Sequence, residues 1–197
     1  CQAKKVAKQQ ELANRQRQLL SPGPVAEIRM GDDDAPVILI EYCAIWAPFC
    51  HQYHKANLPD LKKKYVDTGR LLYIYRDIPS NEEGIRTHMI AHCMSAADRV
   101  DFLMQLFDPQ PGIPSAKRVT EIAKRLGYSE KKIEVCLSDD RTRADLEAIY
   151  KGGKLQRLGV AGIPAFFING EKTLGMQPMP VLEGKLNAAF QSSTATT

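Results

Sequence analysis

The amino-acid sequence predicts an α/β fold in which two strand-containing units flank a long helical block. Residues 37–42 and 71–75 are apolar runs of β-formers joined by a helical stretch, which is the pattern of a strand–helix–strand crossover. Residues 82–156 have helical patterning almost throughout, and residues 165–190 return to strand, tight turn, strand and helix. The 197 residues suffice for one domain of ordinary size and an extension.

The first 20 residues form that extension. They lack proline and glycine and are rich in Gln, Ala, Lys and Arg, which predicts a helix. Val6, Ala13 and Leu20 recur every seven residues and form a narrow apolar stripe. The stripe suits an oligomerisation stalk, a helix docked on its own domain, or a frayed end. Pro and Gly in residues 21–24 end the helix, so the extension is assigned to residues 1–22.

The net charge of +4 resides in this extension. The chain has 27 basic and 23 acidic residues, of which the first 20 residues carry five and one, so the remainder is balanced at 22 each. The folded body therefore lacks the basic excess that nucleic-acid binding requires, and no nucleic-acid partner is expected. No apolar run approaches the roughly 20 residues that span a bilayer, so an integral membrane protein is not expected.

The first strand–helix–strand unit is preceded by a short strand within residues 25–30. Residues 37–42 are almost all apolar, as in a buried central strand. The following helix starts at Pro48, where a missing N–H is harmless, and Pro59 is expected to kink it. Strand 71–75 completes the unit.

The helical block is predicted to contain four helices. An amphipathic pattern over residues 88–107 indicates one continuous helix, which the proline-rich residues 108–112 end. Three further helices are expected, with Ser129 as a good N-cap. They cover residues 116–126, 129–137 and 141–158.

The final segment predicts a hairpin and a helix. Strand 165–168 is followed by the tight turn Asn169-Gly170, a returning strand and a helix over residues 181–190. This order of elements predicts a thioredoxin-like fold with an all-helical insertion domain and an N-terminal helical extension. The thioredoxin-like domain is assigned to residues 23–80 and 157–191, and the insertion to residues 81–156.

The chemistry is expected where the strand 37–42 runs into the next helix, at Trp46-Ala47-Pro48-Phe49-Cys50. A thiol at a helix N-terminus has a lowered pKa and is reactive, and redox proteins place a Cys-x-x-Cys pair there, one thiol to attack and one to resolve. Cys50 provides the second thiol, and alanine occupies position 47, where the first belongs. The motif therefore predicts a thiol–disulfide site that lacks its nucleophile.

Five cysteines stand at positions 1, 43, 50, 93 and 136, without zinc-site spacing. His51 and His54 lie near Cys50 but are too few for a metal site, so neither a metal nor another cofactor is expected. Cys43 is expected to be a small core residue, with pairing to Cys50 as the weaker alternative. A chain that begins at Cys1 suggests a lipid-anchored cysteine or a trimmed boundary.

Residues 37–50, the Gly-Ile-Pro-Ala-Phe-Phe run at 162–167 and the helical insertion resemble the DsbA-like thiol–disulfide oxidoreductases of bacterial envelopes. The resemblance spans roughly residues 30–190 and implies a periplasmic or envelope location. The sequence of this chain departs from the family pattern at position 47, where alanine stands in place of cysteine. An engineered substitution, a natural loss and a monothiol chemistry using Cys50 alone all remain open.

The resemblance also implies roles for individual residues. Position 47 corresponds to the nucleophile, Cys50 to the resolving cysteine, and Pro164 to a loop proline in the cis form. Glu41 corresponds to a buried acid that assists proton transfer, which suits the cost of placing a carboxylate in an apolar strand. The implied substrate-binding residues are Pro48, Phe49 and Ile163. Cys93 and Cys136 are the candidates for a structural disulfide, with two buried thiols as the alternative.

The implied function is oxidation or isomerisation of disulfides in folding proteins through the Cys-x-x-Cys site. The expected partners are unfolded or disulfide-containing proteins, a membrane redox partner and further copies of the chain through residues 1–20. With alanine at position 47, this chain is expected to be inactive. The alternatives are a non-catalytic chaperone or peptide-binding module and, less favoured, a glutathione-linked enzyme of the same fold.

Overall fold

The computed structural model describes residues 2–21, 23–107, 114–151 and 154–194. A five-stranded sheet in the order β1-β3-β2-β4-β5 lies at its centre, with β2 and β3 parallel and the other neighbours antiparallel. The strands are β1 (Ile28–Met30), β2 (Val37–Cys43), β3 (Leu71–Asp77), β4 (Ala165–Ile168) and β5 (Glu171–Leu174). The predicted thioredoxin-like α/β fold is confirmed.

The strand register brings three chain segments to one edge of the sheet. Cys43, at the end of β2, lies opposite Asp77, at the end of β3. In the antiparallel pair of β2 and β4, Tyr42 lies opposite Ala165, the first residue of β4. The turn after β2, the end of β3 and the segment before β4 therefore meet at this edge.

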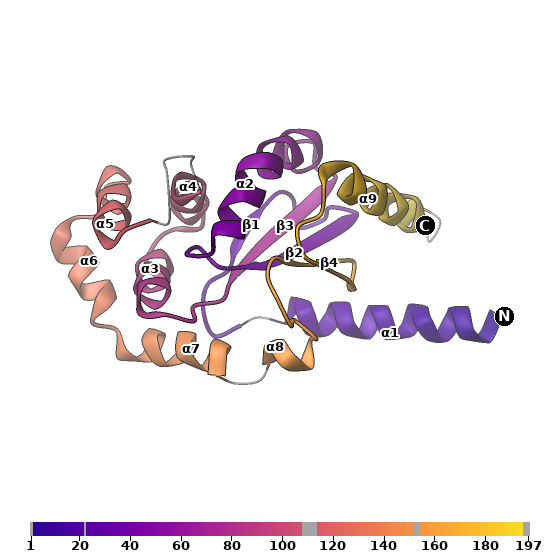
Figure 1. Cartoon of the computed structure of the whole chain (residues 1–197), viewed down its shortest axis with the longest axis horizontal. Coiled ribbons are helices and arrows are strands. Elements are labelled where there is room, and N and C mark those ends of the chain that lie inside the picture. Colours follow the sequence, from indigo (N-terminus) through magenta and orange to yellow (C-terminus); the bar gives the residue numbers. More distant parts are fainter. Residues whose placement is uncertain (1, 22, 108–113, 152–153, 195–197) are drawn as a thin grey trace.

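Alternate residues of each strand face the two layers that cover the sheet. Leu39, Tyr73 and Phe166 belong to a buried cluster with residues of α2 (Pro48–Leu61) and α9 (Met179–Thr194). The next residue of each strand belongs to a second cluster, which includes Leu19 of α1 (Gln2–Leu20). Figure 1 shows α2 and α9 above the sheet and α1 below it.

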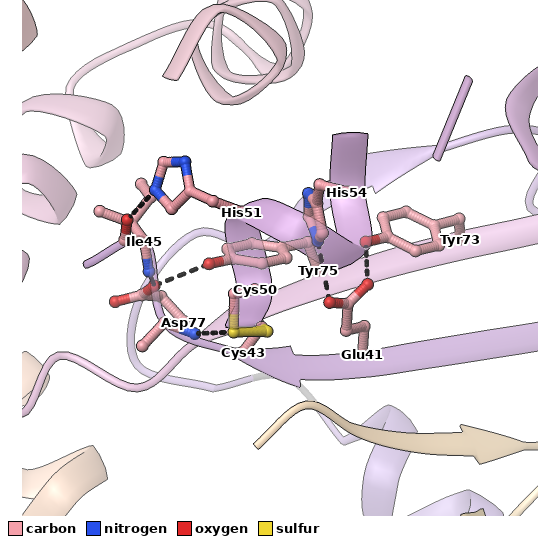
Figure 2. Close-up of a disulfide and its surroundings, with 10 residues drawn as sticks. Glu41, Cys43, Ile45, Cys50, His51, His54, Tyr73, Tyr75 and Asp77 are labelled. Atoms are coloured by element: carbon pink, nitrogen blue, oxygen red, sulfur yellow. Dashed lines mark hydrogen bonds and ion pairs between the residues drawn. A yellow bond between two sulfur atoms is a disulfide. The ribbon is translucent and has the colours of Figure 1, made fainter. Parts of the chain in front are cut away.

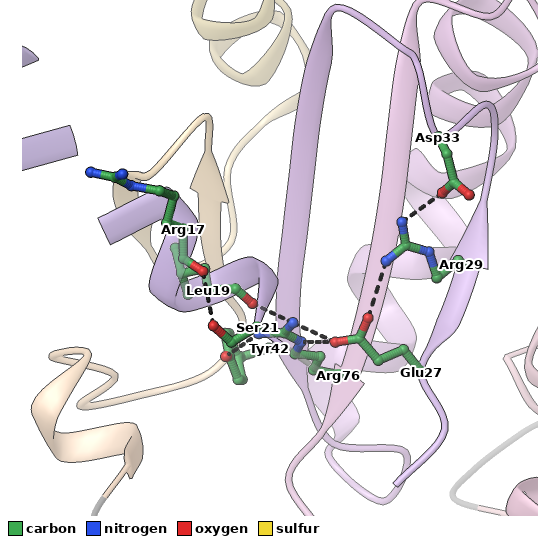
Figure 3. A network of polar contacts seen from close by, with 8 residues as sticks. All are labelled: Arg17, Leu19, Ser21, Glu27, Arg29, Asp33, Tyr42 and Arg76. Carbon is green, nitrogen blue, oxygen red and sulfur yellow. Dashed lines mark hydrogen bonds and ion pairs between the residues drawn. The ribbon is translucent and has the colours of Figure 1, made fainter. Parts of the chain in front are cut away.

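The C-terminal end of α1 is docked on the sheet. Leu19 is fully buried, and Arg76 of β3 donates to its carbonyl at 2.5 Å and to the Tyr42 hydroxyl at 2.8 Å, while its guanidinium also pairs with Glu27 (Figure 3). The opposite end extends past the body, with Val6 59% exposed (Figure 1). At its C-terminal end, α1 is therefore a helix docked on its own domain, which is one of the alternatives that the sequence left open. The oligomerisation stalk, which would use the exposed N-terminal end, stays a prediction.

The insertion differs from the prediction at two places. Residues 88–107 are not one helix: α3 (Glu82–His92) ends before α4 (Ala96–Leu106) begins, because the Ser95 side chain caps α4 by accepting the Asp98 N–H. Residues 141–158 are also divided, into α7 (Asp140–Lys151) and α8 (Lys154–Arg157). The intervening helices, α5 (Ala116–Arg125) and α6 (Glu130–Leu137), follow the prediction.

Two further features complete the fold. Helix α2 contains Pro59 and continues into a π-helical turn over Lys62–Val66. No helix in the part of the chain that the structure describes combines the length and apolar character needed to cross a membrane. The predicted turn at residues 108–112, Cys1 and residue 22 lie outside the described residues.

Candidate redox site

A disulfide joins the end of β2 to the first turn of α2. Cys43 is the last residue of β2 and Cys50 the third of α2, and their Cα atoms are 6.0 Å apart. Both residues are fully buried, and the Ala44 N–H donates to the Cys50 sulfur at 3.2 Å (Figure 2). Cys50 therefore has both a partner sulfur and a backbone donor at the positive end of a helix.

Cys43 is buried in the core as expected, but the disulfide shows that the less favoured alternative, pairing with Cys50, is the correct one. A seven-residue spacing is no recognised motif, and the two thiols meet only because the chain reverses between the strand and the helix. The Cα separation lies within the ordinary range for a disulfide. The expected inactive state is not supported, because Cys50 has a partner sulfur although position 47 is alanine.

Ala47 is the N-cap of α2. Its backbone is extended, its carbonyl accepts the N–H groups of Cys50 and His51, and its side chain is 5% exposed. Pro48 follows at the first helical position, and Phe49 is 61% exposed. The turn thus presents one large apolar ring to solvent and keeps both sulfurs beneath the surface.

Pro164 borders the same edge of the sheet. The Ile163–Pro164 peptide is cis, and it directly precedes β4. Because Tyr42 lies opposite Ala165, the antiparallel register places Pro164 beside Cys43. Pro164 is buried and Ile163 half-buried. The structure therefore brings Pro164 and the two cysteines together, as the resemblance implied for Cys50.

Glu41 lies beside the disulfide and is fully buried (Figure 2). One carboxylate oxygen lies 2.8 Å from His54 Nε2 and the other accepts the Tyr73 hydroxyl at 2.5 Å (Figure 2). Burial, and secondarily the Glu41 charge, raises the pKa of Tyr73 well above its ordinary value. The carboxylate that the strand pattern singled out is therefore held by a histidine from α2 and a tyrosine from β3.

His54 is a site residue to which the sequence analysis gave no role. It lies one helical turn beyond Cys50, and donor atoms of Glu41, Cys43 and His54 all lie within 4.8 Å of one another. His54 Nδ1 has no hydrogen-bond partner among the described residues. The sequence spacing could have identified His54, because a histidine four residues after a cysteine at a helix start lies on the same helix face as that cysteine.

A second polar cluster holds the turn between β2 and α2. The Asp77 carboxylate accepts the Ile45 N–H at 2.9 Å and the Tyr75 hydroxyl at 2.8 Å (Figure 2). His88 Nε2 of α3 lies 3.0 Å from the same carboxylate. These contacts fix Ile45 and with it the path of the chain between the two cysteines.

His51 contacts the same turn through its Nε2 and the Ile45 carbonyl (Figure 2). Burial lowers the pKa of His51, the hydrogen bond to the Ile45 carbonyl opposes this effect, and the nearby Arg118 guanidinium lowers the pKa further. His51 is therefore expected to be neutral near pH 7 and to support the turn through hydrogen bonding rather than through charge.

A second disulfide lies in the insertion. It joins Cys93, directly after α3, to Cys136 of α6, with Cα atoms 6.0 Å apart. Cys136 is buried, whereas Cys93 is exposed. This is the pair that the resemblance implied, and it differs from the Cys43–Cys50 disulfide because one of its two residues is exposed.

A family model described as thioredoxin matches residues 24–185. This chain belongs to the thioredoxin family. Among curated relatives, a Rickettsia bellii protein named "Putative protein-disulfide oxidoreductase" is 27% identical over 153 residues, which are 73% of this chain and 57% of that protein. A Rickettsia prowazekii protein of the same type is also 27% identical over 153 residues. The chain thus spans little more than half the length of these curated relatives.

Solved structures show the same thioredoxin-family fold. Alpha-DsbA1 of Wolbachia pipientis superposes with a TM-score of 0.79 at 22% identity, covering 91% of this chain and 98% of that one. The catalytic domain of Proteus mirabilis ScsC superposes with a TM-score of 0.71 at 17% identity, covering 92% and 98%. The helical insertion is therefore part of a DsbA-like version of the thioredoxin fold.

Proposed function

We propose that this chain is a thiol–disulfide oxidoreductase that acts on protein thiols, and that Cys43 and Cys50 form its redox couple. The observation that carries the proposal is the disulfide between the end of β2 and the first turn of α2, beside the cis proline. The names of the Rickettsia relatives support the same chemistry.

In the proposed reaction, two substrate thiols are oxidised to one disulfide. The two electrons reduce the Cys43–Cys50 disulfide to two thiols, and the reverse reaction reduces a substrate disulfide. Cys50 is the better leaving group, because the helix N-terminus and the Ala44 N–H stabilise its thiolate. A substrate thiolate is therefore expected to attack the Cys43 sulfur, with Glu41 and His54 as the nearest proton-exchanging groups.

Burial limits this reaction in the present chain. Neither Cys43 nor Cys50 is exposed, so a substrate must wait for the turn that follows β2 to open. A cysteine at position 47 would supply a third sulfur at the N-cap, where the present alanine is 5% exposed and Cys43 and Cys50 are 0% exposed. We expect the Ala47→Cys chain to exchange with substrates at least about tenfold faster, because access rather than thiol reactivity is limiting.

Oxidative refolding of a reduced multi-disulfide protein tests the proposal. The test uses a background with Cys93→Ala and Cys136→Ala, which removes the exposed disulfide. In this background the oxidised chain should transfer its disulfide slowly, addition of Cys43→Ala should abolish transfer, and addition of Ala47→Cys should make it faster. Retention of full transfer by Cys43→Ala would show that these two cysteines are not the couple.

A non-catalytic peptide-binding module is the second candidate. The burial of both sulfurs and the exposure of Phe49 favour it. In that case unfolded peptides would bind equally well to the parent and to a variant with Cys43→Ala and Cys50→Ala, and Phe49→Ala would weaken them. Absence of disulfide transfer from both the parent and Ala47→Cys would favour this function.

The compartment and partners belong to the same proposal. Two disulfides suit an oxidising compartment such as the cell envelope, where unfolded or disulfide-containing proteins and a membrane redox partner would be available. Oxidase and isomerase functions differ in assembly, and the exposed end of α1 is the proposed contact between copies. Sedimentation of a Val6→Glu variant beside the parent tests this contact, since Leu19 and the core are untouched.

A further inference from the structure

We propose that the reduced chain binds one Zn²⁺ ion through Cys43, Cys50, His54 and Glu41. The sequence spacing gave no reason to expect a metal, because the four donors come from a strand and from a helix that is folded against it. The proposed site uses the redox cysteines in their reduced state. It requires only that the disulfide can be reduced, not that the chain acts on protein substrates.

The geometry of the donors supports the proposal. Donor atoms of Glu41, Cys43 and His54 lie within 4.8 Å of one another, and the sulfur of Cys50 is bonded to that of Cys43. In tetrahedral zinc sites with Zn–S near 2.3 Å and Zn–N or Zn–O near 2.0–2.1 Å, ligand atoms lie about 3.3–3.8 Å apart. Side-chain rotations on the existing backbone can therefore bring four ligands around one ion.

The chemistry of the donor set suits zinc. Two thiolates, an imidazole and a carboxylate form a mixed set for a borderline-soft ion that prefers four ligands. Further groups already orient these ligands: the Tyr73 hydroxyl donates to Glu41, and the Ala44 N–H donates to the Cys50 sulfur. Such outer hydrogen bonds are typical of metal sites and raise their affinity.

Redox state controls the site, because a disulfide sulfur is a poor ligand. A dithiol or phosphine reductant supplies two electrons that break the S–S bond, which gives two thiols once two protons are taken up. Zn²⁺ then forms two Zn–S bonds and releases those protons. The ion also balances the charge of two buried thiolates and a buried carboxylate, which would otherwise be costly in the interior.

Burial determines how the ion enters. The four residues are at most 2% exposed, so a folded chain offers no open path to them. Metal is therefore expected to enter during folding or local opening and to leave slowly. Refolding of the reduced chain with metal present is accordingly the right way to load the site.

The test uses a Cys1→Ser, Cys93→Ala, Cys136→Ala chain, which retains only the two candidate thiols. It is reduced with a phosphine, refolded with Zn²⁺ or Co²⁺ without oxygen, and passed through a desalting column. We expect one metal per chain, and for Co²⁺ the absorption bands of thiolate ligation in a tetrahedral site. The same chain refolded in its oxidised form is the matched control and should retain no metal.

Single substitutions identify the ligands. Cys43→Ser should weaken Co²⁺ binding by more than about 100-fold, and His54→Ala and Glu41→Gln should change the cobalt spectrum. Unchanged spectra in all three variants would overturn the proposal, as would equal metal retention by the oxidised chain.

A second measurement does not depend on the folding of variants. In the reduced parent chain, zinc should slow alkylation of Cys43 and Cys50 and leave Cys93 unaffected. Equal alkylation rates with and without zinc would overturn the site. Disulfide transfer is assayed in the presence of a chelator, so failure of the metal site and failure of the exchange reaction are observed separately.

Discussion

The two disulfides should stabilise the chain to different extents, because they close loops of different length. Cys93–Cys136 links residues 43 positions apart, and Cys43–Cys50 links residues 7 positions apart. The loop-entropy relation gives about 4 kcal/mol for the longer loop and about 2.4 kcal/mol for the shorter one at 25 °C. The insertion disulfide is therefore expected to be the larger contributor to the free energy of unfolding.

Guanidinium denaturation of two single-disulfide variants measures these contributions. One variant has Cys43→Ala and Cys50→Ala, the other has Cys93→Ala and Cys136→Ala. Each is unfolded in its oxidised and its reduced form, because the difference between the two forms isolates the cross-link from the cavities that alanine leaves. If the same variants are unfolded by heat, a contribution of about 4 kcal/mol corresponds to a shift of roughly 8–16 °C in Tm for a chain of this size.

The comparison can refute the reasoning. An oxidised-minus-reduced difference for Cys43–Cys50 that equals or exceeds the difference for Cys93–Cys136 would show that loop closure does not determine their contributions. A variant with all four alanines is the control, and its unfolding should not respond to reductant.

Three further outcomes are expected. Limited reduction followed by alkylation and mass spectrometry should open the Cys93 disulfide first, since Cys93 is exposed and the other disulfide is buried. The pKa of Tyr73 is raised in the folded chain. The contribution of this shift to the free energy of unfolding is therefore complete below the pKa of tyrosine in the unfolded chain, about 10, and is lost as the pH rises above that pKa. Tyr73→Phe should make denaturation midpoints less sensitive to pH above 10, but should cost about 1–3 kcal/mol at pH 7, because Glu41 loses a buried donor. Ser95→Ala should lower the free energy of unfolding by about 1 kcal/mol in denaturant titrations, because α4 loses its N-cap.

The fold was largely predictable because its periodicities are local. Apolar runs and turn residues predicted the strands, the crossover helix and the Asn169-Gly170 hairpin, in which both residues have positive φ. The break at Ser95 was missed because the apolar period continues across it. The signal was nevertheless present in the sequence, since Ser95 and Asp98 have the Ser-x-x-Asp spacing of a helix N-terminus.

The candidate site was predictable only in part. Glu41 was singled out correctly as a carboxylate in an apolar strand, but its partners lie 13 and 32 residues further along the chain. No sequence pattern connects residues at these separations. The pairing of Cys43 with Cys50 was not favoured from the sequence, because it depends on how α2 folds back against the end of β2 and not on a recognised spacing.

The end of β3 carries two unrelated sets of contacts. Arg76 holds the docked end of α1 on one face of the sheet, and the adjacent Asp77 holds Ile45 on the other face. One peptide unit therefore separates the anchor of the N-terminal helix from the anchor of the turn between the cysteines. Any sliding of β3 along its own axis would displace both anchors together, so the two layers of the molecule are mechanically linked at this point.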